Sequence, residues 1–150
     1  MRAQRGFTLI ELLVVFAMVA LLTALVPLAY ERLRESAQYR DAVRGVLSDM
    51  RQARYRALSE GKDVRFQVDL AHRSYGMEGR PPRSLPEPLR LRTTVADIEL
   101  GADQTAGIRF LPSGGATGGT VEILRPGGAG VRLTVDWLSG AVTQSPVRQQ

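Results

Sequence analysis

The chain has no cysteine, and histidine and tryptophan occur only once each among its 150 residues. The fold therefore contains no disulfide, and the thiol chemistry of cysteine enzymes is excluded. The single histidine, His72, has no cysteine or carboxylate cluster at ligand spacing around it, so we expect no metal and no cofactor. No Ser/His/Asp, Cys/His or paired-carboxylate constellation stands out, and we expect no catalytic residue and no enzymatic activity.

Neither positive nor negative charge strongly predominates. Lysine and arginine together number 20 and the acidic residues 15, which gives a net charge of +5. This mildly basic balance does not require an anionic partner.

The longest stretch without charge runs from Leu12 to Tyr30. As a helix it would extend roughly 28 Å, close to the thickness of a bilayer's hydrocarbon core. Arg2 and Arg5 precede it, whereas the acidic and basic residues that follow it cancel. The positive-inside rule then places the N-terminus in the cytoplasm and the chain after Tyr30 outside. No small-x-small cleavage site follows the run, which disfavours an ordinary secretory signal.

Glu11 stands alone at the cytoplasmic end of this apolar run. An ionised carboxylate in the apolar part of a membrane costs about 3 kcal/mol, so it needs either the headgroup zone or a positive partner. A free amine on Phe7, made by cutting after Gly6, would lie one helical turn away, on the same chain or on a neighbour. Both interpretations of Glu11 stay open on the residues alone.

Pro27 lies inside the same run. Because it cannot donate a hydrogen bond to the carbonyl of Thr23, the helix is expected to bend or loosen there, although a harmless kink fits equally well. Side chains such as that of Thr23 could satisfy backbone groups freed by the proline.

The sequence Gly6-Phe7-Thr8-Leu9-Ile10-Glu11, with its basic leader and apolar run, resembles the class III signal of type IV prepilins and type II secretion pseudopilins. The resemblance implies cleavage by a prepilin peptidase between Gly6 and Phe7, followed by N-methylation of Phe7. It also implies that Glu11 guides filament assembly by pairing with a neighbour's N-terminus, and that the helix unwinds locally near Pro27.

After the membrane the pattern remains helical but becomes amphipathic, which predicts one long helix from near Phe7 to near Ser59. Gly61 is expected to cap its C-terminus. The apolar positions expected to pack on a sheet recur at spacings of three and four: Tyr39, Val43, Val46, Met50, Ala53 and Ala57, with Leu47 and Leu58 widening the stripe.

Alternation with period two then predicts short strands. These are expected at 64–70, 74–78, 89–93, 95–100, 107–111, 120–125, 131–137 and 141–144, with a frayed tail at 145–150. Val131, Leu133, Val135 and Trp137 are expected to share one face. The proline-rich stretch 80–88 is expected to be a loop. The glycine-rich stretch 113–119 lacks the Gly-Lys-Ser/Thr ending of a phosphate loop and is expected to be a hairpin loop.

A helix followed by antiparallel strands predicts an α+β fold, with a long N-terminal helix, transmembrane in its first half, packed on antiparallel sheet. The expected parts are a leader at 1–6, a transmembrane helix at 7–30, an amphipathic helix at 31–60 and a β-rich periplasmic domain at 61–150. The sequence Phe110–Gly114, together with Val131–Trp137 and the turn Ser139-Gly140, resembles the GspH/FimT group of minor pseudopilins and minor pilins.

This resemblance implies a pilin-like, non-enzymatic subunit of a type II secretion pseudopilus, anchored in the inner membrane by a single pass. The implied partners are other minor and major pseudopilins, the prepilin peptidase, the inner membrane and secreted cargo. The alternative is a FimT-like minor type IV pilin that binds DNA for uptake or primes pilus assembly. DNA binding would need several phosphate contacts, and the candidates are few, so no nucleic acid partner is expected: Arg80, Arg83, Arg90, Arg92 and Arg148.

Overall fold

The computed structural model describes residues 8–95 and 105–148, without the side chains of residues 24–32. The chain divides into two compact units, Met1–Ala37 and Gln38–Gln150. One helix, α1 (Leu9–Glu60), runs continuously through both. Gly61 follows it, and its φ of +64° is the left-handed conformation that glycine accepts after a helix C-terminus, so the predicted helix and its cap are confirmed.

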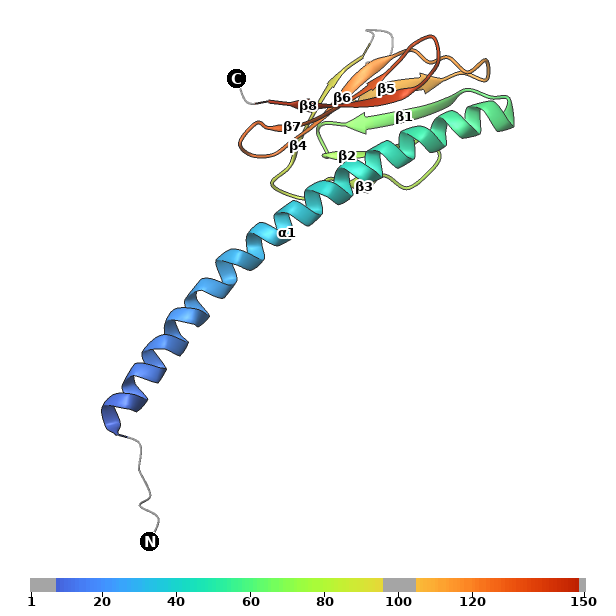
Figure 1. Ribbon diagram of the computed structural model, residues 1–150. Helices are drawn as coiled ribbons and strands as arrows, with labels where there is room; N and C mark the ends of the chain where they lie inside the picture. The colour runs from blue at the N-terminus through green and yellow to red at the C-terminus, as the bar shows by residue number, and fades with distance from the viewer. Residues whose placement is uncertain (1–7, 96–104, 149–150) are drawn as a thin grey trace. The chain divides into compact units, whose positions relative to one another are not determined.

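Eight strands follow the helix and form two antiparallel four-stranded sheets (Figure 1). The first sheet has the order β3-β2-β1-β5, and the second has the order β4-β6-β7-β8. The bounds are β1 (Val64–Asp69), β2 (Ser74–Met77), β3 (Arg83–Ser84), β4 (Arg90–Thr94), β5 (Thr105–Phe110), β6 (Gly119–Leu124), β7 (Gly130–Val135) and β8 (Val142–Val147). The architecture is therefore the α+β arrangement that the sequence predicts.

The core of the second unit joins the helix to both sheets. The C-terminal part of α1 lies along the strands in Figure 1, and its predicted apolar stripe is buried in one cluster with residues from each sheet. Val46, Met50 and Phe66 are fully buried. On β1 the side chains of Val64, Phe66 and Val68 are buried and their neighbours are not, which confirms the predicted alternation. Burial of this apolar surface is the main force that holds the helix on the sheets.

Two predicted core positions are wrong. Leu58 is 45% exposed and does not widen the buried stripe of α1. Trp137, expected inward, is 69% exposed because β7 ends at Val135 and the chain turns at Asp136, which interrupts the alternation.

Strand ends differ from the prediction at three places. The tail is not frayed from residue 145, because β8 pairs with β7 as far as Val147, and Pro146 is tolerated on this edge strand. The proline-rich stretch contains the two-residue strand β3, which pairs with β2. Most of the strand expected at 95–100 lies outside the described residues.

Candidate functional site

The N-terminal motif lies partly within the described structure. Gly6 and Phe7 lie outside the described residues, so cleavage and methylation there stay predictions. Thr8 immediately precedes α1, and Glu11 occupies its first turn with an exposed side chain.

Thr8 caps the helix. The backbone N–H of Glu11 donates to the Thr8 hydroxyl at 3.3 Å, and the N–H of Leu12 donates to the Thr8 carbonyl at 3.2 Å. Threonine at the N-cap with glutamate three residues later is the capping-box pattern, and an acid in the first turn also suits the positive end of the helix dipole. This pattern can be recognised in residues 8–11 of the sequence, and it gives Glu11 a local role; its pairing with a neighbouring subunit stays a prediction.

The helix surface behind the motif is apolar and exposed. Leu9 is 83%, Phe16 66% and Leu22 64% exposed. No helix within residues 8–95 and 105–148, searched without the undescribed side chains, has the length and apolarity needed to cross a membrane.

Position 27 does not interrupt the helix, because α1 continues through it. The Pro27 side chain lies outside the described residues, and the functional kink stays a prediction. The hydroxyl of Thr23 donates to the carbonyl of Val19 at 2.7 Å. It therefore does not reach the carbonyl of Thr23 itself, which Pro27 leaves without its usual donor.

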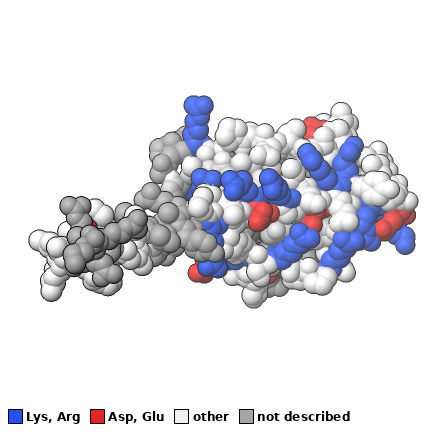
Figure 2. All heavy atoms as spheres, turned by 60° about the horizontal axis from the view of Figure 1, so that its bottom comes forward, with Lys and Arg blue, Asp and Glu red and all other residues white. Residues whose placement is uncertain are grey.

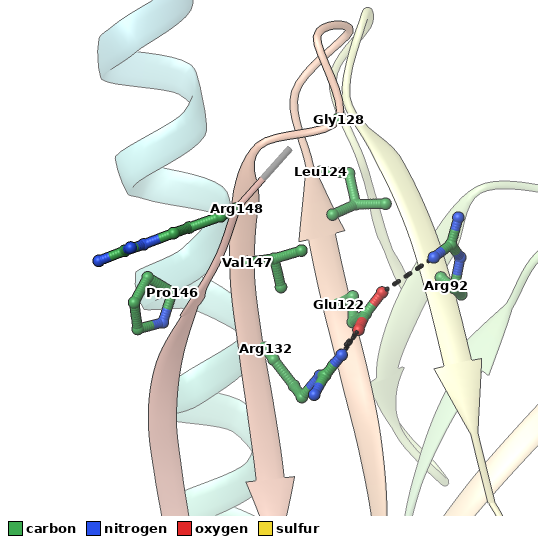
Figure 3. A pocket seen from close by; sticks show the side chains of 8 residues that line it. All are labelled: Arg92, Glu122, Leu124, Gly128, Arg132, Pro146, Val147 and Arg148. Carbon is green, nitrogen blue, oxygen red and sulfur yellow. Dashed lines mark hydrogen bonds and ion pairs between the residues drawn. The ribbon is translucent and has the colours of Figure 1, made fainter. Parts of the chain in front are cut away.

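The globular unit contains a charged cluster that the sequence pattern did not reveal. On the outer face of the second sheet, Arg92, Glu122 and Arg132 lie side by side on β4, β6 and β7 (Figure 3). Glu122 is only 6% exposed, although it stands at a polar position of an alternating strand. Its burial follows from the strand register, which sets an arginine on either side.

His72 takes part in a surface turn. Asp69 accepts hydrogen bonds from the backbone N–H of His72 and pairs with its Nδ1, both at 2.8 Å. Both hydrogen bonds lower the pKa of Asp69 below its ordinary value, and the one from the backbone N–H has the larger effect. Within the described ranges no three acidic or histidine side chains gather as metal ligands.

The glycine-rich stretch is a hydrogen-bonded loop, but the expected hairpin is wrong, because the stretch joins β5 of the first sheet to β6 of the second. The N–H of Leu111 donates to the carbonyl of Gly115, and the N–H of Ala116 donates to the carbonyl of Trp137. The chain then enters β6 directly, and a phosphate loop would need a helix there.

A capped apolar helix that continues into an α+β domain with two antiparallel sheets defines the pilin-like class of subunits. The chain belongs to the family of type II transport protein GspH, whose model matches residues 42–140. A second model, the prokaryotic N-terminal methylation motif, matches residues 1–27. The chain is thus a minor pseudopilin of the type II secretion class.

Two relatives agree with this family. The type II secretion system protein H of Xanthomonas campestris pv. campestris is 32% identical over 148 residues, which cover 98% of this chain and 86% of the relative. The structure of the minor pseudopilin EpsH from the type 2 secretion system of Vibrio cholerae has the same fold, with a TM-score of 0.58. That match is 17% identical and covers 72% of this chain and 96% of EpsH. The family and the motif imply inner-membrane anchoring, a periplasmic domain and other pseudopilins as partners.

The arginines considered for DNA binding do not form one stripe. Arg80 donates to Gln52, and Arg83 and Arg92 pair with Asp49 and Glu122. Figure 2 shows acidic side chains between the basic ones on the viewed face. Such interspersed charge is typical of a solvated protein surface rather than of a surface that follows a phosphate backbone.

Proposed function

We propose that the chain is made as a prepilin, cut after Gly6 and methylated on the new amine of Phe7. Residues 1–6 are then the leader, 7–30 the single membrane pass, 31–60 the amphipathic part of the helix and 61–150 the periplasmic domain. The N-terminus faces the cytoplasm. The mature subunit is a structural component of the secretion pseudopilus and helps to move cargo outward, without an enzymatic step of its own.

The observation that carries this proposal is the presence of both signatures in one chain. The methylation motif covers residues 1–27, and the GspH model begins at residue 42, so the processing signal precedes the family's domain on the same chain. The exposed apolar side chains from Leu9 to Leu22 support the proposal, because such a surface needs lipid or other helices to cover it.

The exposed apolar surface of α1 also explains how the subunit would enter a filament. A helix such as α1 can leave the bilayer only if other apolar helices replace the lipid around it. Glu11 would then lose its polar surroundings unless it met a positive charge. Pairing with the amine of a neighbouring subunit's Phe7 satisfies both groups and sets the axial register between subunits.

Mass spectrometry of the N-terminus tests the proposal. The full chain is expressed with and without a prepilin peptidase, beside a Gly6→Val variant and an Ala3→Val control in the leader. We expect the wild type and the control to lose residues 1–6 and gain one methyl group only when the peptidase is present, and Gly6→Val to stay uncut. An intact Met1 in the wild type, or a cut at another bond, would contradict the assignment.

A further inference from the structure

The outer face of the second sheet carries a hollow of about 580 Å³. Its walls come from all four strands and from the turn after β6 (Figure 3). The lining residues are Arg92, Glu122, Leu124, Gly128, Arg132, Pro146, Val147 and Arg148.

The floor of this hollow is a row of three charged side chains. The register pairs Arg92 with Glu122 and Glu122 with Arg132 across adjacent strands. Arg132 approaches Oε1 of Glu122 through Nε at 2.8 Å and Nη2 at 2.7 Å, and Nη1 of Arg92 lies 3.5 Å from Oε2. Because a buried carboxylate is stable only when it is paired, Glu122 holds the two guanidinium groups in place.

The row leaves a surplus of positive charge. Two guanidinium groups share one carboxylate, and their side chains are still 70% exposed for Arg92 and 50% for Arg132. In Figure 3 both arginines point toward Glu122, whereas Arg148, the residue after β8, extends away from it and adds positive charge at the rim. A planar guanidinium that is fixed and accessible is suited to bind a carboxylate.

The walls favour a peptide over a nucleic acid. Leu124, Pro146 and Val147 give the hollow apolar sides that can contact neighbouring side chains of a peptide. The three arginines supply few of the phosphate contacts that nucleic acid binding needs. We propose that this hollow binds a glutamate or aspartate side chain within an extended acidic segment of a protein partner. The proposal does not depend on cleavage after Gly6.

Binding of a defined peptide tests the site on the full chain in a neutral detergent. The probe is a rhodamine-labelled decapeptide of alternating glutamate and valine, followed by fluorescence anisotropy. Its counterpart carries glutamine in place of glutamate, and a single-stranded DNA of equal charge forms a third arm. The variants are E122Q, R92Q/R132Q and the control R44Q/R51Q, which removes the same charge from exposed positions of α1.

The proposal expects opposite effects from the two pocket changes. R92Q/R132Q should weaken binding of the acidic peptide about tenfold or more, whereas R44Q/R51Q should change it less than about twofold. E122Q should strengthen binding about threefold or more, because both guanidinium groups then face the ligand without an internal competitor. Since R92Q/R132Q leaves Glu122 buried without its partners, R92Q/E122Q/R132Q provides a second variant with the same expected loss.

Several results would overturn the site. If Arg92, Glu122 and Arg132 only stabilise the pairing of the strands, E122Q should not strengthen binding of the acidic peptide. Equal losses in the pocket variants and the α1 control would assign the effect to net charge. Equal binding of the glutamine peptide would remove the role of the carboxylate. Tighter binding of the DNA, lost in R92Q/R132Q, would assign the hollow to nucleic acid instead.

Discussion

In the proposed filament, Glu11 meets a local and an intermolecular requirement at one position. As the third residue of a helix capped by Thr8, it belongs to the first turn of α1 whatever the subunit contacts. As an acid at the end of an apolar surface, it needs a cation when lipid is replaced by other helices. The first role tolerates a neutral polar side chain, but the second does not.

We therefore expect Glu11→Gln to be cleaved normally but to assemble poorly. A hydrogen bond to a charged group contributes about 1.5–3 kcal/mol, so loss of the charge should reduce pseudopilus assembly about tenfold or more. Assembly is measured by cross-linking in cells, together with export of a secreted protein. Thr8→Ala, which costs the cap about 1 kcal/mol and keeps the charge, is the control for helix fraying. Normal assembly and export with Glu11→Gln would contradict the pairing.

Gly45 lies within α1 at a position where the packing of Tyr75 requires glycine. A Cβ at this half-buried position of α1 would lie 2.5 Å from the hydroxyl oxygen of Tyr75. Tyr75 is itself buried, so its ring has little room to move away. The absence of a side chain thus lets the ring of Tyr75 approach the helix backbone.

Gly45→Ala is consequently expected to destabilise the protein although alanine is the better helix former. The gain in helix propensity is at most about 1 kcal/mol, whereas crowding a packed site costs about 1–3 kcal/mol. Urea unfolding of the full chain measures the difference. Tyr75→Phe removes the crowded oxygen, so Gly45→Ala should cost less in that background. An equal cost in both backgrounds would show that the hydroxyl is not the obstacle.

The turn between β7 and β8 is held by several side-chain and backbone hydrogen bonds. Asp136 accepts hydrogen bonds from the Ser139 N–H at 2.8 Å and from its hydroxyl at 2.7 Å, and its carbonyl accepts the N–H of Gly140. On α1, Arg54 donates to the carbonyl of Ser139 at 3.1 Å. These contacts fix the turn that presents Trp137 to solvent.

Stability of this turn should depend on pH. The two hydrogen bonds from Ser139 lower the pKa of Asp136 below its ordinary value of 3.8, and the one from the hydroxyl has the larger effect. A lowered folded-state pKa contributes stability that is present above the ordinary value and is lost as pH falls through the folded value. Asp136→Asn should therefore be less stable than the wild type near pH 6, and the difference should shrink toward about pH 2.5.

Urea unfolding followed by Trp137 fluorescence measures this difference at both pH values. Asp41→Asn, at an exposed position of α1, is the matched control and should show no comparable change. A difference between Asp136→Asn and the wild type that stays constant with pH would show that the charge of Asp136 does not stabilise the turn.

The elements that the sequence predicted are those with local signals. The stripe from Tyr39 to Ala57, the glycine cap and the alternation of β1 depend on neighbours a few residues apart. The division of the strands into two sheets does not depend on such near neighbours, since β1 pairs with β5 across some forty residues. The buried Glu122 was missed for the same reason, because only the register reveals its arginine neighbours. Trp137 was misplaced although Asp136 and Ser139-Gly140 are a readable turn signal.

At the scale of the whole molecule, one helix serves two units with different surfaces. In the first unit the large apolar side chains of α1 that the structure describes are exposed. In the second, the buried stripe starts at Tyr39 and carries the core shared with both sheets. This division supports the proposed exchange of the apolar segment's surroundings, from lipid to other helices, without a change in the packing of the globular domain.

This division predicts that a fragment of residues 38–150 folds without the apolar segment. All residues of the core cluster lie within it, so we expect cooperative urea unfolding with a midpoint within about 10% of that of the full chain. A fragment of residues 51–150 is the control. It lacks Tyr39, Val43, Val46 and Met50, and since one large core truncation alone costs about 2–5 kcal/mol, it should not fold. If the 38–150 fragment unfolded without cooperativity, the globular unit would depend on the membrane segment for its stability.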